Sequence, residues 1–389
     1  PIWGASYGLE YPLWFQRPGA EPVEEVTFHR SNAFDVVAEE VHATRTGVGL
    51  LETTGFAKHE FTGPGARAFL ERTMANRIPE PGRMALTPML NHQGMLIGDF
   101  TVATISTTTD PTNGSEGPER FLVFGSGAAE GHHERWFRSQ LPHTGDRVAY
   151  RPLSHEMAGL SISGPAARQV LASLTDMDVS NDSFRFLDVR RMDLGMVPAL
   201  VARISFTGDL GYEFWVPASL QQRLFQLLTE AGEPHGMRLF GLRALDSMRF
   251  DKGFGAWASE YRPVYTPWEA RMDRFVKLDK GDFIGREAAA ASLAAGPERR
   301  LCLLDVDVDG ADALGDEPIW HDGEVVGWVT SGGYAHWSEV SCALGYLPVA
   351  LTGTDSPSTG FEVEVLGVRR AATRLDEPLF DPSGSRMRS

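Results

Sequence analysis

A chain of 389 residues with 42% hydrophobic and 23% charged residues has the composition of a globular protein and the length of two or three structural units. Its formal net charge of −16 argues against nonspecific binding to nucleic acid or to an anionic membrane, because the field of the whole molecule repels polyanions. No apolar run is long enough to span a bilayer and the N-terminus is not signal-like, so we expect a cytoplasmic protein.

The first 30 residues are rich in aromatic residues, Pro and Gly and then become acidic. They predict a strap that packs on another structure, either the end of a preceding domain or a linker. From Ser31 the apolar spacing changes to that of an amphipathic helix that ends near Gly47. Two strands are expected after it, around 49–51 and 57–61.

A strand followed by Gly-Pro and a helix occurs twice. The first copy begins at Gly63, and the second lies 101 residues later, at Gly164. Proline at a first helical position is preorganised for that geometry, so the dipeptide can recur for structural reasons alone. The repeat therefore predicts two α/β subdomains of a pseudo-repeated domain.

The stretch 86–103 contains a single acid, Asp99, in an apolar run that follows a turn at 91–94. A buried carboxylate without a partner costs several kcal/mol, so it needs a partner, water or a chemical role. Strands at 101–105 and 121–124 are expected to form a hairpin around a polar loop.

Two further motifs have a simple structural interpretation. The glycines of 125–131 resemble a dinucleotide-binding loop, but their spacing is wrong and no βαβ context surrounds them, which favours an ordinary strand-to-helix turn. His132 and His133 point about 100° apart on a helix and have no acidic or thiolate complement, so we interpret them as a surface feature and predict no metal site.

The segment 201–217 predicts a hairpin with an acid, Glu213, in its second strand. Helices are expected at 220–231 and 241–253, and the second of them carries Arg249. A further helix is expected to begin within 283–287.

Beyond Gly296 the helical periodicity ends, and short alternating strands predict a small β-barrel or sandwich of about ninety residues. The strands are expected at 301–306, 324–330, 342–347 and 361–366. Cys302 and Cys342 lie in separate apolar runs of this region, which predicts reduced core thiols and no disulfide.

Asp99, Glu213 and Arg249 are each ionisable and lie in apolar stretches of different segments. Two interpretations are open. A buried arginine–carboxylate pair could join two segments for stability alone. Alternatively, the three could form a pocket for a flat polar heterocycle with an anionic tail, in which a carboxylate accepts two N–H bonds and arginine holds the tail. Aromatic residues such as Tyr212, Trp215 and Trp257 could line its walls.

In their order along the chain, several phrases resemble the folate-binding aminomethyltransferase family, which contains the T-protein of the glycine cleavage system and the C-terminal halves of dimethylglycine and sarcosine dehydrogenases. The dehydrogenase branch is the more similar one. The phrases are LTPMLNHQGMLIGDFTVA (86–103), SFTGDLGYEFWVP (205–217), GLRALDSMRFDKG (241–253), YTPWEA (265–270), FVKLDKGDFIGRE (275–287), EPIWHDGEVVGWVTSGGY (317–334) and SCALGYLP (341–348).

The resemblance implies an α+β fold of three small subdomains in a ring around a central folate channel, the last subdomain being a β-barrel. With it we expect three regions along the chain. They are a strap at 1–30, a folate-binding aminomethyltransferase domain of two pseudo-repeated α/β subdomains at 31–296, and a C-terminal β-barrel domain at 297–389.

Site residues follow from the same resemblance. Asp99 matches the acid beside the reactive nitrogens of tetrahydrofolate, and the family's Asp-Asp pair is here Gly-Asp. Glu213 matches the acid that holds the pterin edge, Tyr212 its neighbour, and Arg249 an arginine near the folate. Trp257 stands near a position where the family often has tyrosine.

The implied function is capture of a methylene unit, as an iminium or formaldehyde derived from an N-methylated amine, to give 5,10-methylenetetrahydrofolate. Asp99 would orient the folate and accept a proton. The chain would be the folate half of a demethylase, with a flavoprotein or other oxidative domain or subunit as partner. The alternatives are direct methyl transfer from a sulfonium or O-methyl donor, and a non-catalytic folate-binding module.

Overall fold

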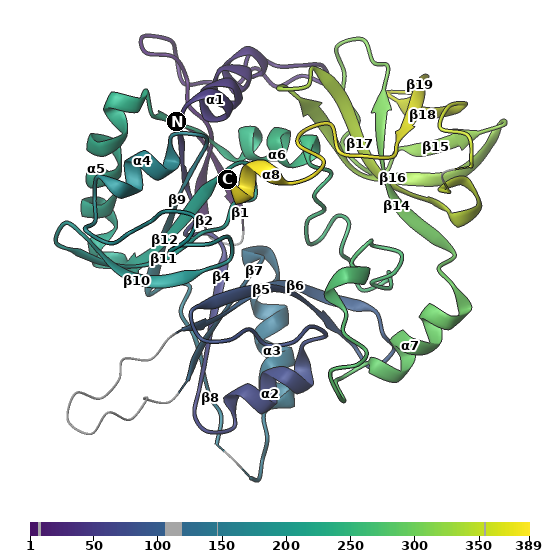
Figure 1. Ribbon diagram of the computed structural model, residues 1–389. Helices are drawn as coiled ribbons and strands as arrows, with labels where there is room; N and C mark the ends of the chain where they lie inside the picture. Colours follow the sequence, from purple (N-terminus) through teal and green to yellow (C-terminus); the bar gives the residue numbers. More distant parts are fainter. Residues whose placement is uncertain (7–8, 106–118, 146, 354) are drawn as a thin grey trace, which may run out of the picture.

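The computed structural model describes residues 1–6, 9–105, 119–145, 147–353 and 355–389. The chain forms three lobes around a common centre, and each lobe is built on its own β-sheet (Figure 1). This arrangement confirms the predicted α+β class. The expected polar loop between 105 and 120 lies mostly outside the described residues.

The first lobe is an antiparallel sheet of five strands in the order β5-β6-β7-β4-β8, with two helices on one face. The hairpin of 101–105 with 121–124 is confirmed as the pairing of β6 with β7. The elements are β4 (Ala57–Thr62), α2 (Ala66–Thr73), β5 (Arg83–Leu90), β6 (Leu96–Ile105), β7 (Arg120–Gly125), α3 (Glu130–Gln140) and β8 (Ala149–Pro152).

The second lobe is a six-stranded sheet in the order β10-β11-β12-β9-β3-β13, antiparallel except for the pair β3 and β13. Helices α4 and α5 cover one face of it. The elements are α1 (Phe34–Thr46), β3 (Gly49–Glu52), β9 (Met157–Ser163), α4 (Ala167–Ala172), β10 (Val189–Leu194), β11 (Val197–Ala202), β12 (Gly211–Pro217), α5 (Gln221–Gly232), β13 (Arg238–Leu239) and α6 (Leu242–Asp251).

The two sheets pack against each other through the faces that carry no helices. Ala103 and Ile105 of β6 share a buried cluster with Leu200, Ala202 and Trp215 of the second lobe. The ring of Trp215 stacks on that of Phe124 at 4.1 Å between centroids. We call the layer between the two sheets the inter-sheet layer.

After α7 (Arg286–Ala295), the third lobe is a closed antiparallel barrel of six strands in the order β14-β17-β16-β15-β18-β19. The predicted barrel is confirmed, although the sequence did not predict its second and last strands, β15 and β19. The strands are β14 (Arg299–Val306), β15 (Pro318–His321), β16 (Glu324–Ala335), β17 (Val340–Pro348), β18 (Phe361–Val365) and β19 (Val368–Leu375). Cys302 and Cys342 are buried free thiols.

The N-terminal segment forms a short hairpin of β1 (Ile2–Ser6) and β2 (Leu9–Trp14). Trp14 is fully buried in a cluster with residues of α1 and α6 such as Val41 and Met248. The hairpin is therefore held by packing against the second lobe.

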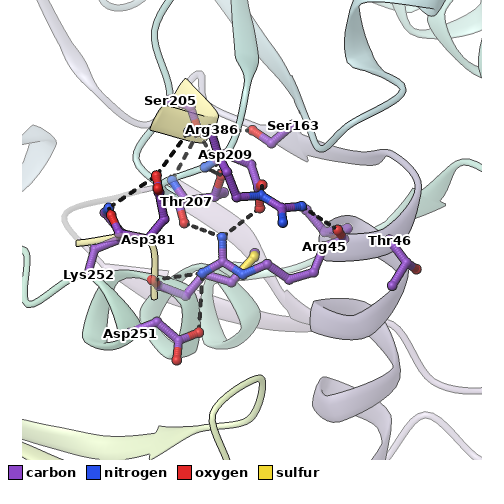
Figure 2. A network of polar contacts seen from close by, with 12 residues as sticks. Arg45, Thr46, Ser163, Ser205, Thr207, Asp209, Asp251, Lys252, Asp381 and Arg386 are labelled. Carbon is purple, nitrogen blue, oxygen red and sulfur yellow. Dashed lines mark hydrogen bonds and ion pairs between the residues drawn. The ribbon is translucent and has the colours of Figure 1, made fainter. Parts of the chain in front are cut away.

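The C-terminal segment leaves the barrel and returns across α6 to end near β1, where it forms the short helix α8 (Ser385–Arg388) (Figure 1). A network of ions fixes it there (Figure 2). Arg45 of α1 is fully buried and contacts Asp209 at 2.6 Å and Asp251 at 3.2 Å. Arg386 of α8 donates to the other oxygen of Asp209 at 2.8 Å, and Lys252 donates to the main-chain oxygen of Asp381 at 2.5 Å.

Candidate functional site

A β-bulge decides which way Asp99 points. In the pairing of β5 with β6, Met89 faces Gly98 and Leu90 faces Leu96, so Ile97 is an extra residue. Ile97 and Phe100 therefore both enter the core beneath α2 and α3. From Phe100 onward the strand alternates regularly, which turns Asp99 to the opposite face, the one that carries Ala103 in the inter-sheet layer.

Asp99 is a partly exposed residue whose Oδ1 is buried and has no hydrogen-bond partner among the described residues. Burial raises the pKa of Asp99 to about 7, and the nearby negative charge of Glu260 acts in the same direction. A carboxyl group in this state is ready to accept hydrogen bonds from a ligand.

Glu260 is fully buried and joins the second lobe to the barrel. Its Oε1 accepts hydrogen bonds from Thr330 and Ser331 of β16, both at 2.6 Å, and its Oε2 accepts one from the Ala256 amide at 2.8 Å. Nη1 of Arg249 lies 3.7 Å from Oε2. Asp99, Glu260 and Arg249 thus belong to one charged neighbourhood.

Arg249 is buried on α6 and already has protein partners. Its guanidinium donates to Asp246 at 2.7 Å, to the Phe254 carbonyl at 3.0 Å and to Ser331 at 3.3 Å. Since guanidinium has five N–H groups, these bonds leave at most two free for a ligand.

Glu213 lies on β12, opposite Ser161 of β9 and Ala202 of β11. It shares a face of the sheet with Trp215 and therefore also points to the inter-sheet layer. Burial raises the pKa of Glu213 to about 7, and the positive charge of Lys58 opposes this change. Among the described residues, no ion pair within 4 Å engages the Glu213 carboxylate.

Lys58 is a buried cation near Glu213. Its ammonium group donates to the carbonyls of Thr54 at 2.8 Å and Phe56 at 2.7 Å. Burial lowers the pKa of Lys58 to about 8. The group therefore supplies positive charge near Glu213 without forming an ion pair with it.

Tyr212 and Trp257 lie in different surroundings from the acids. Tyr212 is fully buried on the helix-covered face of its sheet and stacks on Phe184 at 5.8 Å, so it does not share a face with Glu213. Trp257 is half-buried in the loop after α6, with its ring 5.1 Å from that of His133. The structure thus places Trp257 against α3, next to the histidine that contacts Ile97 of β6, and Tyr212 in the helix-covered core of the second lobe.

The interpretation of both histidines as surface residues is wrong for His133. His132 is exposed, but the ring of His133 is fully buried beneath β6. Phe137, four residues further along the same helix, is also fully buried, so helical spacing was the signal that His133 faces inward. Within the described residues, no group of three or more His, Cys, Asp or Glu side chains is placed to hold a metal ion.

Glu260 and Tyr261 are the site residues that the sequence analysis missed. The side chain of Tyr261 is half-buried near Asp99 and Glu260, and desolvation, together with these two acids, raises its pKa. Glu260 lies in the mixed sequence AWASEYRP and not in an apolar run like those of Asp99 and Glu213. Glu260 follows the predicted helix 241–253 by seven residues and directly precedes Tyr261, and neither position singles it out.

A cavity of about 830 Å³ opens at one edge of the inter-sheet layer, between the sheets of the first two lobes. Trp215, Arg120, Arg151 and Met192 are among its lining residues, and Asp99, Glu213 and Arg249 are not. We base the candidate site on the chemistry of the acids, because the cavity holds none of the partnerless groups described above.

Comparison with known proteins identifies the class to which this architecture belongs. The profile of the GCVT N-terminal domain matches residues 2–280, and that of the glycine cleavage T-protein C-terminal barrel domain matches residues 299–381. Together with the relatives below, these matches define an enzyme of the folate-dependent transferase type. The chain belongs to the aminomethyltransferase family of the glycine cleavage T-protein.

Two curated relatives represent the two branches of this family. Mitochondrial dimethylglycine dehydrogenase of Mus musculus is 34% identical over 387 residues, which are 99% of this chain and 43% of that protein. An aminomethyltransferase of Desulfitobacterium hafniense is 28% identical over 341 residues, which are 87% of this chain and 89% of that protein. The chain therefore spans less than half the length of the dehydrogenase.

A solved structure shows the same fold. Glycine cleavage system aminomethyltransferase T from Bartonella henselae superposes with a TM-score of 0.79 at 21% identity, covering 98% of this chain and 94% of that one. The likeness confirms the three-lobed architecture with its C-terminal barrel. No described helix has the length and apolar character needed to cross a membrane.

Proposed function

We propose that this chain transfers a one-carbon unit, derived from an N-methylated amine, to tetrahydrofolate to give 5,10-methylenetetrahydrofolate. The observation that carries the proposal is the state of Asp99, a carboxyl group with a buried, partnerless oxygen and a pKa near 7. An acid in this state costs stability, and a chemical role accounts for its presence.

The residues present fit a folate. Two acids, Asp99 and Glu213, face the inter-sheet layer without a base bound within 4 Å among the described residues, and both have a raised pKa. Such groups suit a ligand rich in N–H donors, which an aminopyrimidinone edge supplies. Arg249 and Lys58 provide positive charge in the same region for an anionic tail.

Each residue has a distinct part in the proposal. Tetrahydrofolate, when bound, supplies weakly basic amines that accept a one-carbon electrophile. Glu213 accepts N–H bonds from the pterin edge, and Trp257 forms an apolar wall. Asp99 as carboxylate orients the reacting amines, stabilises positive charge and accepts a proton at its buried oxygen. We assign no ligand contact to Tyr212, because its side chain lies in the core.

The oxidation of the amine is a separate reaction in this proposal. Two-electron oxidation of an N-methyl group needs an electron acceptor, and the chain matches only the 43% of dimethylglycine dehydrogenase that corresponds to these three lobes. We therefore assign the oxidative step to a flavoprotein or other domain or subunit outside these residues, and the capture of its product to this chain.

Two assays test the proposal. Tetrahydrofolate at about 100 times its dissociation constant should stabilise the fold by about 2.7 kcal/mol, measured as a rise in Tm. With formaldehyde as the donor, the initial rate of 5,10-methylenetetrahydrofolate formation should exceed that of the spontaneous condensation.

The outcomes separate the three candidate activities. Stabilisation without any rate above background indicates a non-catalytic folate-binding module. Formation of 5-methyltetrahydrofolate from a sulfonium or O-methyl donor indicates direct methyl transfer. Absence of both stabilisation and transfer contradicts folate binding altogether.

A further inference from the structure

His133 contacts the bulge that orients Asp99. Its Nε2 lies 2.8 Å from the carbonyl oxygen of Ile97, the extra residue of β6. A carbonyl only accepts, so Nε2 carries the hydrogen and donates it. Because Ile97 has no counterpart on β5, His133 gives this carbonyl a hydrogen bond that the strand pairing does not offer.

The bulge has a large effect on the site because strand side chains alternate with a period of two. Ile97 lies in the core beneath α2 and α3. If the strand continued regularly from Ile97, Asp99 would enter the same core, two residues further on. The extra residue therefore moves the carboxyl group from the core to the inter-sheet layer.

Gly98 supports this geometry. A Cβ atom built on Gly98 would lie 2.2 Å from the ring of Phe100, so a side chain at 98 and this position of the Phe100 ring exclude each other. The ring of His133 packs edge-on against that of Phe100, at 4.6 Å between centroids. His133 thus contacts the bulge through a hydrogen bond to Ile97 and through ring packing on Phe100.

Packing alone does not explain why a histidine occupies position 133. Its Nδ1 is buried without a partner among the described residues, and burial lowers the pKa of His133 to about 3, which keeps the ring neutral. An unpaired buried acceptor lowers the stability of the folded state. A phenylalanine would fill the space without that cost but would leave the Ile97 carbonyl without its donor.

The same ring also contacts the proposed folate wall. Trp257 packs against His133 in an edge arrangement, with 5.1 Å between centroids and 61° between planes. One buried side chain on α3 therefore supports both the strand that carries Asp99 and the half-buried Trp257 after α6.

We propose that His133 is a positioning residue for one-carbon transfer, which holds the bulge at Ile97 and thereby keeps Asp99 on the inter-sheet face. The inference rests on the proposed function for the reaction that Asp99 serves. In this proposal His133 itself contacts neither the one-carbon donor nor the carboxyl group of Asp99.

The kinetic test compares two kinds of replacement. His133→Phe and His133→Leu remove the donor, whereas His133→Gln keeps an N–H group at nearly the same distance from the main chain. We expect the first two to lower kcat at least about tenfold while the dissociation constant of tetrahydrofolate changes less than about threefold. His133→Gln should recover most of the loss, and His132→Gln, on the exposed neighbour, should have no effect.

A second measurement does not depend on activity. In an Asp99→Cys variant the thiol should react with a small thiol reagent, because residue 99 is partly exposed and Cys302 and Cys342 are buried. Adding His133→Phe should slow this labelling at least about tenfold as residue 99 turns toward the core, and His133→Gln should restore it.

The results distinguish the two proposals. Unchanged labelling in the His133→Phe or His133→Leu background overturns the inference, whichever variant folds better. So does a folded non-donor variant with kcat within about twofold of the parent protein. A parent protein that fails to transfer above background overturns the proposed function, while the labelling still decides whether His133 orients residue 99.

Discussion

At the scale of single residues, Asp99 and Glu213 share one property. Each is a half-buried acid without an ion pair among the described residues, and in each desolvation raises the pKa to about 7. A folded-state pKa above the unfolded value means that the folded state binds more protons between the two values. Stability therefore falls as the pH rises through this window.

This linkage gives a prediction for Asp99→Asn. The cost of ionising Asp99 is absent below its unfolded pKa of 3.8, grows as the pH rises, and is complete above about pH 7. The variant should match the parent protein near pH 4 and exceed its free energy of unfolding by about 2 to 4 kcal/mol at pH 8. Urea unfolding across this pH range measures the difference.

A stability difference between Asp99→Asn and the parent that does not change with pH would show that Asp99 is not a strained acid. Glu213 titrates in the same window in both proteins, so its contribution cancels in the comparison.

Glu213 is predicted to act in binding and not in the chemical step. Glu213→Gln replaces one acceptor oxygen by a donor and should weaken tetrahydrofolate binding about tenfold, with kcat within about threefold of the parent. Titration calorimetry measures the affinity. Glu324→Gln, an exposed acid on the barrel strand β16, serves as the control and should leave the affinity unchanged. Equal affinity in Glu213→Gln would remove this residue from the pterin site.

The sequence indicated Asp99 and Glu213 as acids in apolar surroundings, because each interrupts an apolar run. Their neighbours in the fold could not be predicted. Glu260 lies in a mixed segment, and its partners Thr330 and Ser331 are about 70 residues away on the barrel. The spacing of His133, four residues before Phe137 on the same helix, indicated that it faces inward and His132 outward, but its hydrogen bond to Ile97, 36 residues away, was not predictable.

At the scale of elements, the hairpin of β5 and β6 shows what a local pattern can and cannot specify. The turn at 91–94 was predictable because Asn and Gly favour turns. In the structure Gly94 adopts a positive φ of 76°, and the Asn91 side chain accepts hydrogen bonds from the amides of residues 93 and 95. The bulge at Ile97 was not predictable, since it depends on contacts with α3 that are distant in sequence. The direction in which Asp99 points was therefore hidden from sequence analysis.

The ion network between α1, α6 and α8 gives a prediction at the same scale. Arg45→Met leaves Asp209 and Asp251 buried without their shared base and should reduce the free energy of unfolding by about 3 to 5 kcal/mol. Arg386→Ala removes a half-exposed partner of Asp209 and should cost only about 1 kcal/mol. Urea unfolding at pH 7 compares the two. Equal losses of unfolding free energy would show that the buried Arg45 contributes no more to stability than Arg386.

At the scale of the whole molecule, the three lobes enclose the candidate residues on different elements. Asp99 comes from the first lobe, Glu213 and Arg249 from the second, and the partners of Glu260 from the barrel. The sequence predicted the order of these units, because strand and helix periodicities are local. It did not predict β15, which is only four residues long, or β19, whose sequence VRRAATRL has three arginines and no apolar alternation.

The central claim is that Asp99 serves the transfer step, and one measurement tests it most directly. Asp99→Asn keeps the size of the side chain but cannot accept a proton as a carboxylate does. The variant should bind tetrahydrofolate within a few-fold of the parent protein and form 5,10-methylenetetrahydrofolate slower by a factor on the order of 10² or more. A variant that binds tetrahydrofolate and transfers the one-carbon unit at the parental rate would contradict the account.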